Sequence, residues 1–317
     1  MKKTKQGAVI TADVGASKVK FAVVNLKQEL TEYLNIPPVS LVGLELDNNK
    51  FLDIITDGIK KCSATLAGEE DFPLAISIGS PGPLDSLGGV ILNPPNLKGV
   101  RNLAITAELK NIFDLPIFLL NDADASLLGE LWFREYKKLK NVVYITLSSG
   151  VGSGVLKDGQ LETGSELGHK PLSGMSEERV CSCGEMNHAE AYLGTKGLAE
   201  TYAKIFGLQF GQMKPEDRHE VSPNMRKGVA NNKKKWLELE IEYSKHLALF
   251  LKNIAVQKPE LIILGGGIIF GNQSLLAKTK EELKKLMPNE AVNIELAESG
   301  HNVNLGAAKY ALEQLGL

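Results

Sequence analysis

The apolar positions at the start of the chain have the short, β-branched pattern of strands. Residues 8–12 and 19–24 are largely apolar, and the small residues at 13–17 separate them. This order of strand, turn and strand predicts a β-hairpin. Residues 142–147 have the same strand pattern, and we interpret the small residues 148–154 as a second turn. Two such units, one in each half of the chain, indicate a duplicated architecture.

Between and after the hairpins, helical and strand patterns alternate, which favours an α/β fold. Helical spacing of apolar positions predicts helices over 51–66, 123–135, 236–255 and 305–315. Short apolar runs predict strands over 74–78, 117–120 and 261–264. Residues 79–85 are rich in proline and glycine, and residues 207–235 are polar, so both predict loops. We interpret the lysines at 233–235 as a solvated helix start.

The composition is that of an ordinary globular protein. At ~150 residues per domain, 317 residues suggest two domains, and 43% hydrophobic residues allow a packed core. A formal net charge of −2 argues against a nucleic-acid binder. Three cysteines exclude a disulfide scaffold. The longest uncharged apolar stretch, residues 261–270, is far below the ~18 residues of a membrane span. We therefore expect a cytoplasmic protein without nucleic-acid or membrane partners.

Three clusters of small residues are candidate phosphate sites: 13–17, 148–154 and 265–267. Small residues let backbone N–H groups approach an anion, and Asp13 could hold a water of a divalent cation. Each cluster is also compatible with a tight turn, and the last with a strand-to-helix turn before a cap at residues 272–274. Val155 stands where a dinucleotide fingerprint needs a third glycine, and no Walker lysine follows.

Asp122 follows the predicted strand 117–120, so it lies at the carboxyl end of that strand. A carboxylate there can accept a proton from a bound hydroxyl. It could instead cap the helix that begins near Ala123. Both roles are possible if Asn121 caps or positions and Asp122 reacts.

Two cysteines and two histidines lie close together in the sequence. Cys181 and Cys183 are two positions apart, and His169 and His188 flank them. Two thiolates and two imidazoles match the tetrahedral preference of zinc, and four protein ligands make a structural site. The alternative is a pair of free thiols beside unrelated histidines.

Together these residues resemble the ROK family of sugar kinases, named for repressors, open reading frames and kinases. The resemblance covers residues 8–308, and its motifs occur in the family's order. They are two phosphate motifs (13–20 and 148–154), the loops Pro-Gly-Pro (81–83) and Pro-Asn-Leu (95–97), Asn121-Asp122, Glu-x-Gly-His (166–169) and an adenosine motif (259–267).

The resemblance implies an actin-like, ribonuclease-H-like ATPase fold, with two α/β domains around a cleft that binds ATP and magnesium. We place the first domain at residues 1–120 with 303–317, and the second, with the zinc motif, at 121–302. The resemblance makes Asp122 the general base for a sugar 6-hydroxyl. The sugar hydroxyls would be bound by Asn96, Asn121, Asp122, Glu166, His169 and Glu190. The nucleotide would be bound through Asp13, Gly15, Ala16, Ser17, Lys20, Ser149, Gly150, Gly152, Gly265, Gly266 and Gly267.

The sequence departs from the family in the zinc motif, which usually reads Cys-x-Cys-Gly-x-x-Gly-Cys-x-Glu. Here His188 stands in place of the third cysteine and Asn187 in place of the preceding glycine. Because histidine also binds zinc, we predict His169, Cys181, Cys183 and His188 as the ligands.

The resemblance implies a hexose kinase, with a glucokinase first. An N-acetylhexosamine kinase (for N-acetylglucosamine or N-acetylmannosamine) or a fructokinase is the alternative, because the sugar-binding glutamates are shared. A repressor of the same family would need a DNA-binding domain, and only seven residues precede Ala8. A third hypothesis is a sugar-binding protein without catalysis, and the presence of the general-base candidate Asp122 disfavours it. The family commonly forms dimers, so we expect a homodimer.

Overall fold

The computed structural model of the protein describes residues 7–26, 30–31, 38–66, 72–136, 138–270, 272–298 and 302–317. The chain forms two compact units. Unit 1 comprises Met1–Lys138 with Glu298–Leu317, and unit 2 comprises Leu139–Ala297. None of the helices in the described ranges is both long enough and apolar enough to cross a membrane.

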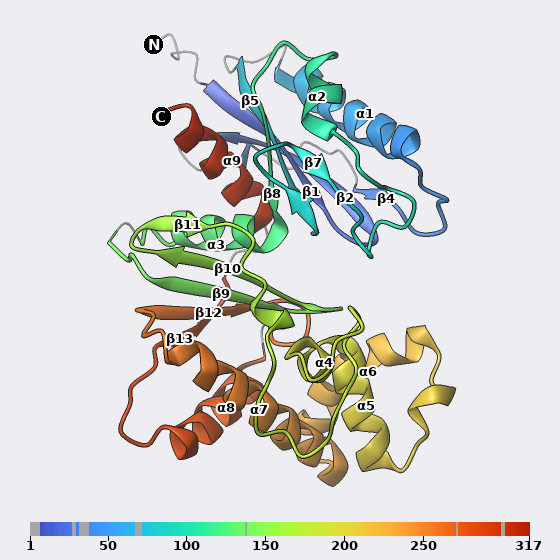
Figure 1. The fold of residues 1–317 in the computed structure, drawn as a ribbon, viewed down its shortest axis with the longest axis vertical. Helices are drawn as coiled ribbons and strands as arrows, with labels where there is room; N and C mark the ends of the chain where they lie inside the picture. Colours follow the sequence, from blue (N-terminus) through green and yellow to red (C-terminus); the bar gives the residue numbers. More distant parts are fainter. Residues whose placement is uncertain are drawn as a thin grey trace. The chain divides into compact units, whose positions relative to one another are not determined.

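Unit 1 is built on one mixed sheet (Figure 1). The predicted hairpin is present: β1 (Gly7–Val14) pairs antiparallel with β2 (Lys18–Asn25). On its other side β1 pairs parallel with β5 (Phe72–Ser80), which pairs parallel with β8 (Ile117–Asn121). Beside β2 lie β3 (Leu30–Thr31) and β4 (Val39–Ser40), and the loops after β5 contain β6 (Leu84–Asp85) and β7 (Val90–Ile91).

Helices cover both faces of this sheet. Side chains alternate between the faces along β1, so Ala8, Ile10 and Ala12 pack with the core of α1 (Asn48–Leu66) and α2 (Ile105–Lys110). Val9 points to the opposite face, where α9 (Asn302–Gln314) contributes Leu305. Figure 1 shows α9 and α1 on the two sides of the β1–β5 sheet. The predicted C-terminal helix is therefore part of the N-terminal unit.

The helix α3 (Asp122–Phe133) also belongs to unit 1, because it packs closely against α9. The two helices approach at glycines: a Cβ on Gly306 would overlap the backbone of Ala125, and one on Gly129 the backbone of Asn302. The compact unit consequently ends after Lys138, one helix later than the boundary expected at residue 120.

Unit 2 repeats the sheet of unit 1. Its central strand β9 (Val142–Leu147) pairs antiparallel with β10 (Val151–Lys157) and parallel with β12 (Leu261–Gly265). The outer strands are β11 (Gln160–Glu162) and β13 (Ile294–Leu296). The order β11-β10-β9-β12-β13 is that of β3-β2-β1-β5-β8 in unit 1, with the same strand directions. The predicted duplication is thus confirmed in the topology.

A helical layer packs on the unit 2 sheet. The long helix α7 (Lys234–Ala255) and α8 (Gln273–Leu286) share a core with Val143, Ile145 and Leu147 of β9. The same core includes residues of α4 (Glu190–Leu193), α5 (Thr195–Phe206) and α6 (Pro215–Ala230). Two short 3-10 helices, η1 (Leu167–His169) and η2 (Phe210–Gln212), lie in the connecting loops.

Two sequence predictions about unit 2 are wrong. Residues 207–235 are not a loop, because α6 fills most of that range; its central Pro223 and its few apolar positions hid the helical pattern. Residues 148–154 are not one turn, because β10 already begins at Val151, so Gly152 lies inside a strand opposite Thr146. The lysines at 233–235 do mark a helix start, as predicted, since α7 begins at Lys234.

Candidate functional site

In unit 1, Asp13 and the Asn121-Asp122 pair lie at the carboxyl ends of β1 and β8, the two parallel strands on either side of β5. The strand register pairs Asp13 of β1 with Gly79 of β5, and Ser80 of β5 with Asn121 of β8. The carboxyl ends of parallel strands are where α/β sheets bind ligands. The fold therefore brings Asp13 and the Asn121-Asp122 pair to one edge of this sheet.

The turn of the first hairpin carries a charge pair at its base. Asp13 and Lys20 are opposite each other in the register, and Lys20 Nζ lies 2.8 Å from Asp13 Oδ2. Both side chains are largely shielded, with 28% of Lys20 and 14% of Asp13 exposed. Ala16 and Ser17 at the tip are exposed, and Gly15 N donates to Lys18 O at 2.9 Å. Two of the residues predicted to belong to the nucleotide site, Asp13 and Lys20, are thus paired with each other.

The structure decides which of Asn121 and Asp122 is the helix cap. Asn121 is the N-cap of α3, and its Oδ1 accepts a hydrogen bond from Ala123 N at 2.8 Å. Asp122 is the first residue of the helix and is half-buried. Capping is the task of Asn121, and the partial positive charge of the helix start favours the ionised carboxylate of Asp122.

In unit 2, the second hairpin turn is short and is held from two sides. Ser148 N donates to Gly150 O at 2.9 Å, and both Thr195 N and Thr195 Oγ1 donate to Ser148 O at 2.9 Å. Ser149 at the tip is exposed. Immediately after the turn, Val151 N donates to Glu190 Oε2 at 3.1 Å. The predicted phosphate turn and the predicted sugar ligand Glu190 are therefore direct neighbours.

The third glycine cluster lies at the end of the strand beside that turn, since Gly265 is opposite Thr146 in the parallel β12–β9 register. Gly266 has a φ of +89°, and a Cβ there would overlap the backbone of Leu147. Around Gly267 the space is open for 4 Å. The predicted cap is also present, because Asn272 Oδ1 accepts from Leu275 N at 3.2 Å at the start of α8.

The four predicted zinc ligands form one cluster. One donor atom from each of His169, Cys181, Cys183 and His188 can be chosen so that all lie within 4.8 Å of one another. Cys181 Sγ is 3.5 Å from His169 Nδ1, and Cys183 Sγ is 3.2 Å from His188 Nδ1. Donors of a tetrahedral zinc site are roughly 3.3–3.8 Å apart for bonds of about 2.0–2.3 Å. The donor types fit a zinc ion, and these two pairs lie close to the tetrahedral spacing, although the cluster as a whole, at up to 4.8 Å, is wider.

The surroundings of Cys181 favour its neutral thiol when no metal is bound. Burial raises the pKa of the Cys181 thiol to about 11, because a thiolate is disfavoured away from water. A thiolate at this position therefore needs a positive charge beside it. Zinc would supply that charge and deprotonate the thiol.

His169 and Ser182 connect the cluster to Glu190. His169 directs Nδ1 toward Cys181 and Nε2 toward Glu190 Oε2, at 4.0 Å. Ser182 Oγ donates a short hydrogen bond to Glu190 Oε1. The expected double role of His169 is thus compatible with its placement. Sequence reasoning missed Ser182, although its position between two ligands was visible.

Two predicted sugar ligands lie outside these contacts. Asn96 is exposed in the loop after β7, and Glu166 is exposed at the N-cap of η1, where its side chain makes no capping hydrogen bond. Register and hydrogen bonds thus bring together Glu190, His169 and the second hairpin turn, and separately Asp13 and Asn121. Neither set includes Asn96 or Glu166.

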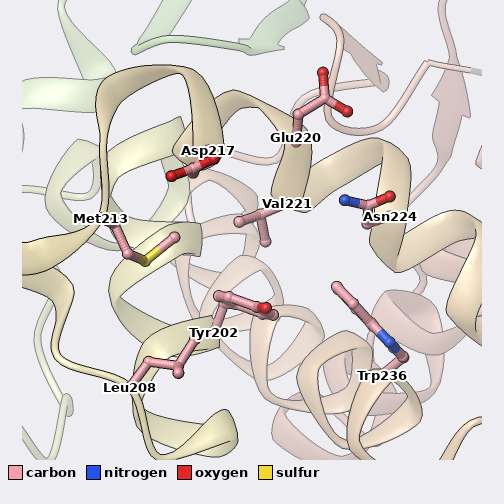
Figure 2. Close-up of a pocket in the computed structure, with 8 residues that line it drawn as sticks. All are labelled: Tyr202, Leu208, Met213, Asp217, Glu220, Val221, Asn224 and Trp236. Atoms are coloured by element: carbon pink, nitrogen blue, oxygen red, sulfur yellow. The ribbon is translucent and has the colours of Figure 1, made fainter.

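A cavity of about 260 Å³ lies elsewhere in unit 2, between α5, η2, α6 and α7. Figure 2 shows Asp217, Glu220 and Asn224 of α6 above an apolar wall that includes Tyr202 and Trp236. None of the predicted site residues lines it. Its two carboxylates disfavour the phosphates of a nucleotide.

The comparisons with known proteins identify one family. The sequence pattern of the ROK family matches residues 9–314. A glucokinase of Pyrobaculum calidifontis is 32% identical over 75% of this chain and 78% of its own length. A xylose repressor of Caldicellulosiruptor bescii is 26% identical over 88% of this chain and 70% of its own length. An N-acetylmannosamine kinase of Haemophilus influenzae is 26% identical over 95% of this chain and 94% of its own length.

A solved structure agrees with this assignment. The ROK hexokinase from Thermus thermophilus superimposes with a TM-score of 0.78 at 23% identity, covering 98% of this chain and 99% of that one. The protein therefore has the actin-like ATPase fold that the motifs implied. The chain belongs to the ROK family.

Proposed function

We propose that this protein is an ATP-dependent sugar kinase that phosphorylates the 6-hydroxyl of a hexose. The observation that carries the proposal is the placement of Asp122 at the carboxyl end of β8, with Asn121 performing the capping. A carboxylate at the carboxyl end of a parallel strand is placed where α/β sheets bind ligands, and it can accept a proton from a bound hydroxyl. The kinases among the relatives support the same assignment.

In this proposal Asp122 accepts the proton of the sugar hydroxyl while the hydroxyl oxygen forms its bond to the γ-phosphorus and the bond to ADP breaks. Phosphoryl transfer depends on positioning and charge neutralisation more than on covalent chemistry. Asp122 sits at the junction of β8 and α3, where two regular elements position its backbone. We assign the rest of the sugar contacts to Asn96, Asn121, Glu166, His169 and Glu190.

We assign the nucleotide phosphates to the turns at Gly15–Ser17 and Ser149–Gly150 and the adenosine to Gly265–Gly267. ATP arrives with magnesium, which neutralises the phosphate charge. Asp13 is the side chain at the first turn that could hold a water of that ion, and Lys20 holds the Asp13 carboxylate in place. Gly152 lies inside β10, so it would contribute to the nucleotide site only by leaving space where another residue has a side chain.

We further propose that His169, Cys181, Cys183 and His188 hold a structural zinc ion. The compact donor cluster supports this assignment. Zinc would supply a fixed positive charge and a cross-link between these loop residues. Neighbours of this cluster orient Glu190: Ser182 Oγ donates to one carboxylate oxygen and Val151 N donates to the other.

Glucose is the first candidate sugar, because a glucokinase is among the relatives. N-acetylmannosamine or N-acetylglucosamine is the alternative, since an N-acetylmannosamine kinase aligns over nearly the whole chain. Fructose stays a third possibility from the shared motifs. The cytoplasmic location and the homodimer also stay predictions; size-exclusion chromatography with light scattering tests the dimer.

The similarity to a xylose repressor favours a second function, sugar sensing without catalysis. It predicts sugar binding without turnover. The kinase proposal predicts turnover that depends on Asp122.

A coupled assay of ADP release over glucose, mannose, fructose, N-acetylglucosamine and N-acetylmannosamine tests the proposal. We expect turnover with at least one sugar, and we expect Asp122→Asn to lower kcat by roughly 10²- to 10⁴-fold, the usual contribution of a general base. Asp114→Asn is the control, because Asp114 is an exposed carboxylate in the loop before β8 and belongs to none of the predicted sites. No turnover on any sugar, or full turnover by the Asp122 variant, would overturn the assignment.

A further inference from the structure

The position where the ROK zinc motif has glycine holds Asn187 in this chain, and its backbone is left-handed, with a φ of +59°. Glycine adopts this conformation freely, and asparagine is among the few other residues that tolerate it. The substitution therefore preserves the turn of the loop. It also adds a side chain, and that side chain makes contacts that glycine lacks.

The Asn187 side chain closes the loop that carries the two cysteines. Asn187 N donates to Arg179 O at 2.8 Å, and Arg179 N donates to Asn187 Oδ1 at 2.9 Å. This pair of hydrogen bonds joins the two ends of the segment that contains Cys181 and Cys183. The ligand His188 comes immediately after the closure. Only the first of the two bonds would exist with glycine at position 187.

The hydroxyl of a buried tyrosine, Tyr192, contacts the same side-chain amide of Asn187. Tyr192 is fully buried, and its hydroxyl lies 2.7 Å from both Asn187 Oδ1 and the carbonyl oxygen of Glu177. A hydroxyl has one proton, so these two acceptors share it. The Tyr192 ring lies under the Arg179 guanidinium, whose centre is 5.1 Å from the ring centroid.

Arg179 fixes this arrangement to the helical layer. Its guanidinium donates to Gly197 O at 2.9 Å and to Thr201 Oγ1 at 3.1 Å, both in α5. The closure of the loop is thus tied through Arg179 to α5 and through Tyr192 to α4. Groups behind a metal ligand that fix its orientation commonly change metal affinity by about 10- to 100-fold when removed.

We propose that Asn187 is a positioning residue that pre-organises the ligand loop for zinc. The inference rests on the proposed zinc site. A positioning role and a purely conformational role of Asn187 predict opposite effects of Asn187→Gly on zinc affinity. If only the left-handed backbone mattered, Asn187→Gly would bind zinc at least as well as wild type; if the side chain matters, the same variant binds zinc more weakly.

The test measures the zinc dissociation constant by competition with a chromophoric chelator, together with the melting temperature of the zinc-free protein. We expect Asn187→Gly to weaken zinc binding by about 10- to 100-fold. Asn187→Asp keeps the acceptor oxygen and is expected to bind close to wild type. Asn232→Gly is the control, because Asn232 is also left-handed, with a φ of +52°, but lies in the turn before α7. It should leave zinc binding unchanged.

Tyr192→Phe keeps the buried ring and removes only its hydroxyl, so it tests the same network if Asn187→Gly fails to fold. It is expected to weaken zinc binding in the same direction. Wild-type affinity in both Asn187→Gly and Tyr192→Phe would overturn the inference while leaving the zinc site intact. A wild-type protein that binds no zinc would instead overturn the proposed site, and the inference with it.

Discussion

At the scale of single residues, His188 is the predicted zinc ligand at which the sequence departs from the family motif. Its Nδ1 faces Cys183 Sγ at 3.2 Å, so the imidazole reaches the cluster. We expect His188→Ala to lose zinc on dialysis, because a tetrahedral site with three protein ligands is open to water. His188→Cys supplies a thiolate and should retain zinc.

Metal content by atomic absorption after dialysis against a weak chelator measures this prediction. His219→Ala serves as control, since His219 is exposed on α6. Full zinc retention by His188→Ala would show that the protein binds the ion through other ligands.

His246 is a buried residue whose protonation opposes folding. Its side chain lies edge-on to Tyr192, with ring centroids 5.7 Å apart. Burial, and secondarily the charge of Arg179, lowers its pKa to about 4, against the partial opposition of Glu242. The unfolded chain therefore binds this proton at a higher pH than the folded chain does. Stability is fully present above pH ~6.5 and falls as the pH drops toward 4.

From these values, His246 should remove roughly 1–2 kcal/mol of stability between pH 7 and pH 5. We expect His246→Gln to show a smaller loss than wild type over this interval. Urea unfolding at the two pH values measures the difference. An equal loss in both proteins would assign the acid sensitivity to other groups.

At the scale of elements, the turn after β12 contains two adjacent glycines, of which only the first requires glycine for its backbone conformation and its packing. Gly266 needs both its left-handed φ and its missing side chain, whereas Gly267 faces open space and lies outside the left-handed region. Gly266→Ala should cost roughly 1–3 kcal/mol, the usual scale of such strain. Gly267→Ala should leave the melting temperature unchanged.

The same pair tests the proposed adenosine contact. A methyl at position 267 would occupy space that the nucleotide needs, so we expect a higher KM for ATP and an unchanged KM for the sugar. An unchanged KM for ATP would remove Gly267 from the nucleotide site. Melting curves of both variants separate this effect from folding.

The elements that sequence patterns predicted best are those with a strong local period. The strand 142–147 agrees with β9 at both ends, and the helix 236–255 starts within two residues of α7. The helix α6 was missed because Pro223 interrupts it and because few of its side chains are apolar and buried. Pro215 at its first turn, followed by Glu216 and Asp217, was a usable start signal.

At the scale of the whole molecule, the C-terminal helix completes the N-terminal unit. The helix α9 approaches α3 closely at Gly306, where a side chain would overlap the Ala125 backbone. We expect Gly306→Val to destabilise unit 1 by roughly 1–3 kcal/mol or more, as overpacking does. Gln314→Ala, at an exposed position of the same helix, should be neutral.

Thermal unfolding followed by circular dichroism measures this prediction. A wild-type melting temperature for Gly306→Val would mean that the two helices can separate without cost. Limited proteolysis provides a second readout, since cleavage should increase within residues 7–136 rather than within unit 2.

The sequence by itself determined which chemistry this chain offers. The spacing of Cys181 and Cys183, the Asn121-Asp122 pair after an apolar run and the glycine turns are all local patterns, because strand and helix periods depend on near neighbours. Those patterns were sufficient for the α/β class and the family.

Only the tertiary structure decided which distant residues meet. It paired Asp13 with Lys20, brought Glu190 to the second hairpin turn, returned α9 to unit 1 and joined Asn187 to Arg179 and Tyr192. Such contacts depend on strand order and on how the layers pack, and both arise from burial of apolar faces across the whole unit rather than from spacing along the chain. Asn187 looked like a defect in a motif, and the fold makes it the residue that closes the ligand loop.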